Sequence, residues 1–138
     1  MNRAAASRHR RAWLFLTTAL ALHVLDEALT GFLSFYNPLV LQMRAALGWF
    51  PMPTFSFWPW LGGLIALVVV LFLLTPAVRR GAAGTRAASW ILAIIMLFNG
   101  LGHLLGSIYF QRWLPGATSA PLLLITSIQL MRATRARI

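Results

Sequence analysis

Four long apolar runs dominate this chain, and short segments containing arginine, proline or glycine separate them. A helix needs about 20 predominantly apolar residues, rising about 1.5 Å each, to cross a bilayer. Three runs meet this length, at residues 13–36, 58–78 and 88–110. The pattern therefore predicts an all-α polytopic membrane protein, folded as a four-transmembrane-helix bundle in a single domain over residues 1–138.

The fourth apolar run is shorter than the others, and we place its helix at residues 114–131. Its continuous apolar part covers about 15 residues, or about 22 Å of helix, against a hydrocarbon core of about 30 Å. Pro115 fits the first turn of a helix, whereas Pro121 would bend the segment or set a later start. Length alone therefore does not establish this span.

The arginines are distributed unevenly around the four runs. Most of them precede the first run, lie between the second and third, or follow the fourth: Arg3, Arg8, Arg10, Arg11, Arg79, Arg80, Arg86, Arg132, Arg135 and Arg137. Only Arg44 and Arg112 fall in the other connections. Because basic residues in short loops stay in the cytoplasm, this distribution predicts four spans with both termini cytoplasmic.

The connection between the first two predicted spans, residues 37–57, has its own pattern. It contains three prolines, and its apolar residues are spaced as one face of a short helix: Leu39, Val40, Met43, Ala46 and Leu47. We expect this segment to lie along the outer membrane interface, with three tryptophans at headgroup depth: Trp49, Trp58 and Trp60.

The composition agrees with a membrane protein, because 59% of the residues are hydrophobic and only 10% are charged. The net charge of +10 could suit a nucleic-acid partner, but the arginines flank the apolar runs, so we expect no nucleic-acid binding. The absence of cysteine excludes disulfides and thiolate metal sites.

The N-terminus has two interpretations. A basic start followed by Ala19-Leu20-Ala21 resembles a cleaved signal peptide, but the apolar run continues well beyond that point, which favours an uncleaved span. We place the protein in a bacterial inner membrane, and we expect His9 to lie in a solvated basic tail that serves topology.

Two polar clusters lie inside the first and third predicted spans. The first contains His23, Asp26 and Glu27, and the second contains Asn99 and His103. An ionised residue at the centre of a spanning helix costs roughly 2.5 to 3.5 kcal/mol, so such clusters usually have partners and a function. The clusters lie at matching depths because both helices run outward from the cytoplasm. Gly100, Gly102 and Gly106 are expected to let these two helices approach closely.

Two imidazoles and a carboxylate form a competent site for zinc, iron or manganese. The predicted metal ligands are His23, Glu27 and His103. Asp26 is a fourth ligand or a base, and Asn99 would polarise a ligand or a substrate carbonyl. Water in an open metal position would favour hydrolysis, and an iron centre would favour oxygen chemistry. The expected function is thus a metal-dependent enzyme, hydrolase-type or oxygenase-type, with Asp26, Glu27 and Asn99 as catalytic residues and a lipid-like substrate.

Other interpretations of the same residues remain open. The carboxylic acids could serve a metal-free acid/base isomerase, because apolar surroundings favour the protonated form. His23 and His103 could ligate haem, or the five polar side chains could simply hydrogen-bond to one another. A proton-coupled carrier, formed as a homo-oligomer, and an accessory subunit packed on partner helices are the non-enzymatic alternatives.

The clusters also carry a resemblance to a family of membrane proteins of unknown function named for an HxxEE motif, which has NxxxH and YxPG motifs as well. The segment from His23 to Glu27 resembles the first motif, with Asp26 in place of a glutamate, and Asn99 to His103 resembles the second. Trp113-Leu114-Pro115-Gly116 stands where the third is expected, with tryptophan in place of tyrosine. The resemblance implies a shared membrane site but no established activity. A looser likeness connects the clusters with sterol-isomerase-type membrane proteins.

Overall fold

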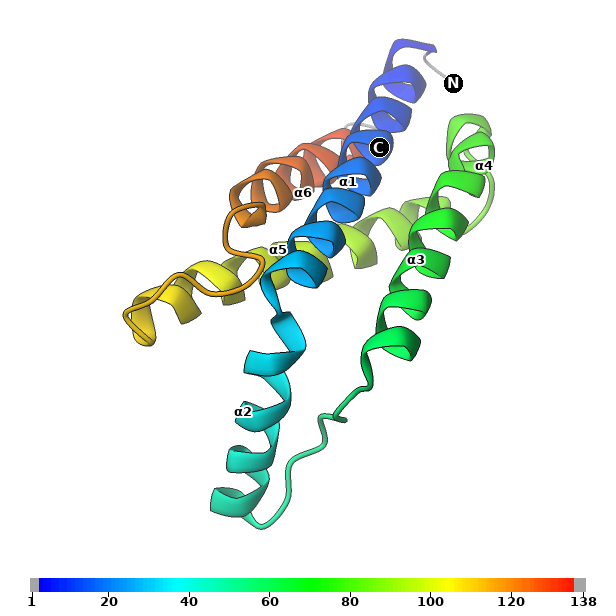
Figure 1. The fold of residues 1–138 in the computed structure, drawn as a ribbon. Helices are drawn as coiled ribbons and strands as arrows, with labels where there is room; N and C mark the ends of the chain where they lie inside the picture. The colour runs from blue at the N-terminus through cyan, green and yellow to red at the C-terminus, as the bar shows by residue number, and fades with distance from the viewer. Residues whose placement is uncertain (1–2, 136–138) are drawn as a thin grey trace.

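A computed structural model describes residues 3–135, and these residues form helices joined by turns, with no β-strand among them (Figure 1). The six helices are α1 (Arg3–Thr30), α2 (Phe32–Leu47), α3 (Phe57–Leu73), α4 (Thr75–Arg80), α5 (Thr85–Tyr109) and α6 (Ala120–Arg135). The all-α prediction is confirmed. Three segments are long and apolar enough to cross a membrane: Ala4–Thr30, Phe57–Arg80 and Thr85–Tyr109.

The first predicted span differs from the helix in the structure. Residues 13–36 were expected to form one helix, but α1 begins at Arg3 and ends at Thr30, and α2 follows as a separate helix. Gly31 lies between them with φ of 78°, a left-handed conformation that interrupts the right-handed helix and that glycine adopts without steric strain. The chain therefore changes direction one turn after Glu27.

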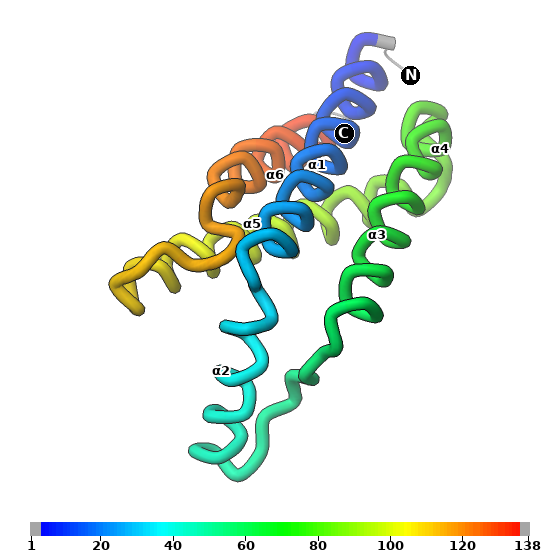
Figure 2. Tube along the Cα trace, viewed as in Figure 1, coloured from blue at the N-terminus to red at the C-terminus, as the bar shows by residue number. Residues whose placement is uncertain are grey.

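The predicted interfacial segment, residues 37–57, consists of most of α2 and the irregular segment that connects α2 to α3. The Asn37 side chain holds the two together, because its Nδ2 donates to Phe55 O at 2.8 Å and its Oδ1 accepts from Phe55 N at 3.0 Å. The Tyr36 hydroxyl donates to Pro53 O at 2.9 Å. These bonds bring the chain back to the end of α1, where α3 begins and then runs alongside α1 toward its start (Figure 2).

The fourth predicted span is also different in the structure. Residues 110–119 form turns, and α6 begins at Ala120, later than the expected start at residue 114. Pro121 accounts for this start, because proline is tolerated in the first turn of a helix but not in its interior. Sixteen residues give about 24 Å of helix, and α6 is not among the three segments long enough to span. The four-helix count is therefore not confirmed.

Helix α6 packs against both α1 and α5, and α1 also packs against α3 and α4 (Figures 1 and 2). Gly100 of α5 faces α6, because a Cβ there would lie 3.0 Å from the Leu124 side chain and 3.1 Å from Ala120 O. A Cβ on Gly106 would lie 2.8 Å from Leu114, whereas Gly102 faces open space. The expectation that these glycines bring the first and third spans together is wrong, since Gly100 accommodates α6, Gly106 accommodates the turn before it and Gly102 contacts neither.

Helices α1 and α5 nevertheless contact each other at two points along their length. His9 Nε2 of α1 lies 2.9 Å from Ser89 Oγ of α5, and the rings of His23 and His103 lie 4.7 Å apart. The second pair follows the first by the same number of residues on each helix, so the two helices run in the same direction. His9 is fully buried, which corrects its placement in a solvated tail.

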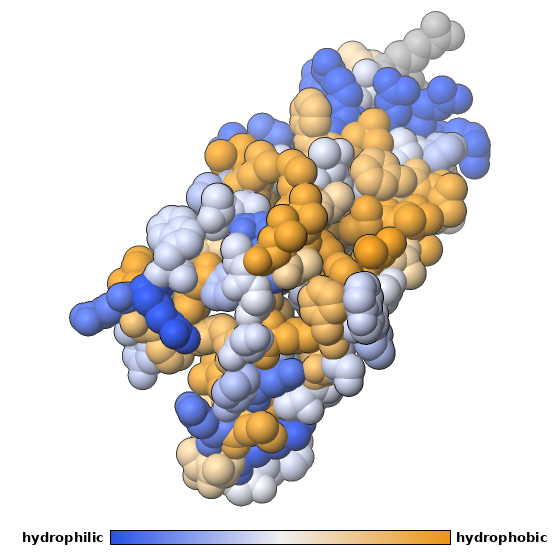
Figure 3. Space-filling view, in the orientation of Figure 1, coloured by the Kyte–Doolittle hydropathy of each residue, from blue (hydrophilic) through white to orange (hydrophobic). Residues whose placement is uncertain are grey.

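The outward faces of the long helices are apolar. Large hydrophobic side chains are exposed along α1, α3 and α5: Leu25, Leu29, Ile65, Val69, Ile91, Ile95, Phe98, Leu105 and Ile108. Figure 3 shows one side of the molecule, with hydrophobic residues over its middle and hydrophilic residues at the end where α1 begins and α4 ends. An exposed apolar surface of this extent is typical of helices in contact with lipid.

Candidate metal centre

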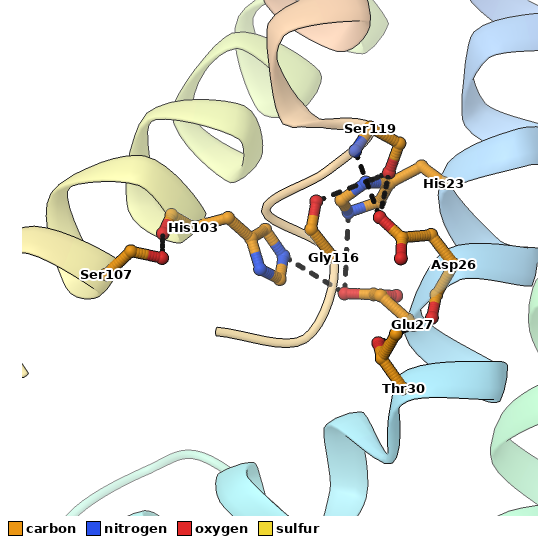
Figure 4. A network of polar contacts seen from close by, with 8 residues as sticks. All are labelled: His23, Asp26, Glu27, Thr30, His103, Ser107, Gly116 and Ser119. Carbon is orange, nitrogen blue, oxygen red and sulfur yellow. Dashed lines mark hydrogen bonds and ion pairs between the residues drawn. The ribbon is translucent and has the colours of Figure 1, made fainter. Parts of the chain in front are cut away.

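Three side chains from α1 and α5 converge inside the protein (Figure 4). Glu27 Oε1 lies 3.0 Å from His103 Nε2 and 3.5 Å from His23 Nε2. One potential ligand atom from each residue lies within 4.8 Å of the other two. All three residues are buried: the exposed fraction of the residue surface is 1% for His23, 5% for Glu27 and 8% for His103. Sequence spacing placed Glu27 and His103 at the same depth, and their contact confirms that expectation.

These separations suit a small cation. Two donors that each lie 2.0 to 2.1 Å from a tetrahedral zinc ion are about 3.3 to 3.4 Å apart. The two contacts of Glu27, at 3.0 and 3.5 Å, fall on either side of this value. His23 and Glu27 can point the same way because residues four apart share a helix face. Small side-chain movements would therefore complete a His-Glu-His ligand set.

A chain of hydrogen bonds fixes the orientation of the His23 ring. Ser119 Oγ donates to Asp26 Oδ2 at 2.7 Å and lies 2.8 Å from His23 Nδ1. The Ser119 backbone N–H also donates to Asp26 Oδ2, at 3.0 Å. Since the hydroxyl has one proton and directs it to the carboxylate, His23 Nδ1 must be the donor to Ser119 Oγ.

This assignment determines which His23 nitrogen is free to bind a ligand. A neutral imidazole protonated at Nδ1 has its lone pair at Nε2. His23 Nε2 is buried and has no hydrogen-bond partner among the described residues, and it points toward Glu27 Oε1 (Figure 4). In this tautomer, His23 Nε2 and Glu27 Oε1, 3.5 Å apart, would both be acceptors, and a cation between them would stabilise the pair.

Gly116 closes the site from the turn before α6. Its φ is +83°, and a Cβ there would lie 2.7 Å from His103 Cε1 and 3.0 Å from Glu27 Cγ. Only glycine allows the backbone to pass so close to the two side chains. The Ser107 hydroxyl supports this turn, because it accepts from Leu114 N at 3.0 Å and donates to His103 O at 2.7 Å.

A cavity of about 420 Å³ reaches Glu27 from the side of α2 and α3. Four aromatic side chains line it: Phe32, Phe55, Phe57 and Trp60. Phe32 stacks on Trp60 with centroids 5.8 Å apart and lies 5.7 Å from the His103 ring. The cavity therefore places four aromatic rings next to one carboxylate, and ligand pockets commonly combine apolar walls with a few polar groups in this way.

The structure separates the five sequence-predicted site residues into two groups. His23, Glu27 and His103 come together, whereas Asp26 contacts Ser119 and reaches the three only through it. The Asn99 side chain has no hydrogen bond to them, and its Oδ1 is buried without a partner among the described residues. Hydrogen bonding therefore connects Asp26 to His23 Nδ1 through Ser119, and Asn99 does not belong to this network.

Sequence reasoning missed the roles of Ser119, Gly116 and Phe32 in this site. Ser119 lies in a turn with no local signal for contact with α1, and Phe32 was assigned to a continuous first helix. Gly116 was recognised as part of a motif, and that motif is the signal that could have placed the turn at the site.

Comparisons with known proteins do not add a function. No family model matches the chain, and no curated protein and no solved structure matches it.

Proposed function

We propose that His23, Glu27 and His103 bind one divalent metal ion and that the protein is a membrane-embedded metal-dependent enzyme. The observation that carries this proposal is the buried Nε2 of His23, which has no hydrogen-bond partner among the described residues and points at Glu27 Oε1 beside His103. Two histidines and one carboxylate are a ligand set used by zinc and by non-haem iron.

The chemistry follows from the number of protein ligands. Three ligands leave a coordination position for water, whose pKa a bound zinc ion lowers toward neutrality. Asp26 and Ser119 hold His23 in the tautomer that presents Nε2 to the metal. Hydrolysis is the preferred reaction when the metal is zinc, and oxygen chemistry is preferred when it is iron.

The proposed substrate is lipid-like. The aromatic cavity is next to Glu27, so an apolar group lying along Phe32 and Trp60 would bring an adjoining polar bond to the site. Phe32 and Trp60 belong to α2 and α3, and α3 begins a segment with the composition of a membrane span. A substrate dissolved in the bilayer could enter from this side without crossing bulk water.

Metal analysis of the detergent-purified protein tests the proposal. After reconstitution with zinc or iron, we expect about one ion per chain, lost in His23→Ala and His103→Ala. His9→Gln is the matched control, because His9 is also buried in α1 but bonds Ser89 at the far end of that helix. Metal retention in both triad variants, or equal loss in His9→Gln, would contradict the proposal.

A metal-free function is the second candidate. The contact of 3.0 Å between His103 Nε2 and Glu27 Oε1 is already a good hydrogen bond, as an acid/base pair requires. Such an enzyme would lose proton-transfer activity in Glu27→Gln while binding no metal in its native form. Membership in the HxxEE-motif family, both termini cytoplasmic and a homo-oligomeric or partner-bound state remain predictions.

A further inference from the structure

A second cavity lies at the opposite end of α1 from the metal centre. It measures about 420 Å³ and is formed between α1 and α6. Arg8 and Arg11 line it from α1, and Arg132 lines it from α6. The remaining wall includes the Phe15 ring and the Gln129 amide. The proposed metal chemistry uses none of these residues.

Helix geometry explains why the three guanidinium groups share this cavity. Arg8, Arg11 and Phe15 are separated by three and four residues, so they lie along one face of α1. Arg132 lies in the last turn of α6, which packs against α1 with its C-terminal end beside the start of that helix. The arrangement gathers three positive charges from two helices around one hollow.

No carboxylate of the described chain neutralises these charges. The chain has only two acidic residues, Asp26 and Glu27, and both belong to the site at the other end of α1. Asp26 lies about 22 Å from Arg11 along the helix, which exceeds the screening length of about 8 Å at physiological salt. The cavity is therefore a concentrated positive site in which no carboxylate of the described residues competes with an external anion.

We infer that this cavity binds the phosphate group of an anionic phospholipid. A guanidinium group presents a planar fork of N–H donors that matches phosphate oxygens, and the Gln129 amide adds further donors. Phe15 is 56% exposed on the same face, one turn beyond Arg11 toward the apolar middle of α1, where it can contact an acyl chain. The combination of a basic head and an apolar wall fits a lipid better than a free anion, and basic pockets between membrane helices bind lipid headgroups in this way.

Native mass spectrometry of the full chain in detergent micelles tests the inference, with phosphatidylglycerol, phosphatidylcholine and inorganic phosphate as separate probes. We expect the wild-type protein to retain phosphatidylglycerol at least tenfold more tightly than phosphatidylcholine. The double variant Arg11→Gln with Arg132→Gln should lose at least tenfold of this affinity. Arg79→Gln with Arg80→Gln is the matched control, because these arginines are also exposed but lie outside the cavity.

Three results would overturn the inference. Equal retention of the two lipids by the wild-type protein would show that the headgroup is not recognised, and this comparison needs no variant. An equal loss of affinity in the Arg79/Arg80 variant would assign lipid binding to diffuse charge. Binding of inorganic phosphate without selective binding of phosphatidylglycerol would identify a free anion as the ligand.

Discussion

The replacement Ser119→Ala tests how the protein orients its first metal ligand. Alanine removes the hydroxyl that links Asp26 Oδ2 to His23 Nδ1, at 2.7 and 2.8 Å. It keeps the backbone N–H of residue 119, which donates to Asp26 at 3.0 Å and continues to tie the turn to α1. The change therefore frees the His23 ring while retaining a main anchor of the fold.

The expected loss of metal affinity follows from the hydrogen bond between Ser119 and the proposed metal ligand His23. Loss of such an orienting partner typically lowers metal affinity 10-fold to 100-fold, which corresponds to about 1.4 to 2.7 kcal/mol. Each lost side-chain hydrogen bond should lower the free energy of unfolding by about 0.5 to 1.5 kcal/mol, so the two bonds together should lower it by about 1 to 3 kcal/mol. The two effects are of similar size, so zinc affinity is compared between folded proteins.

The assay is a competition titration of zinc against a chromophoric chelator, in detergent at fixed pH. Ser127→Ala is the matched control, because Ser127 is a buried serine of α6 whose Oγ has no hydrogen-bond partner among the described residues. We expect the zinc Kd of the control to stay within about twofold of wild type. A folded Ser119→Ala protein with an unchanged Kd would refute the role assigned to Ser119.

Three further predictions concern the surroundings of the site. Gly116→Ala should lower both the thermal stability and the zinc occupancy, because its Cβ would lie 2.7 Å from His103 Cε1. Gly84→Ala is the control, because Gly84 has a φ of +80° but no atom within 4 Å of its Cβ position, so it should lower stability through backbone strain and leave zinc occupancy unchanged. Thermal melts and metal analysis measure the two effects. His9→Ala should lower the free energy of unfolding by about 1 to 3 kcal/mol in chemical denaturation, because it removes a buried ring and its hydrogen bond to Ser89 Oγ, although Ser89 still donates to Thr85 O at 2.8 Å, and zinc content should not change. Trp60→Ala should leave zinc content unchanged but lower the kcat/KM for a fluorogenic long-chain ester about tenfold or more, and an unchanged value would exclude the aromatic cavity as the substrate site.

The depth of the site could be predicted from the sequence because it depends only on counting along helices. The contact of Glu27 with His103 is consistent with two helices that run in the same direction from similar predicted starting points. The all-helical fold and three of the apolar segments also follow from composition and length.

The remaining features depend on contacts between distant segments, which local patterns do not encode. The apolar run continues through Gly31, so hydropathy gives no sign of the turn there, although the left-handed φ explains it afterwards. His9 is buried because Ser89 from another helix meets it, and Ser119 reaches Asp26 only after the turn folds back on α1. Helix α6 occupies the place between α1 and α5 that the glycines were expected to close.

X-ray absorption spectroscopy of the zinc-loaded protein tests the central claim most directly, because it reports the ligands of the metal itself. Our account predicts two imidazole nitrogens and one or more oxygens at about 2.0 to 2.1 Å, with the imidazole scattering unchanged in His9→Gln and reduced in His103→Ala. A zinc ion surrounded only by oxygen, or one whose imidazole scattering does not change in His103→Ala, would contradict a metal centre formed by His23, Glu27 and His103.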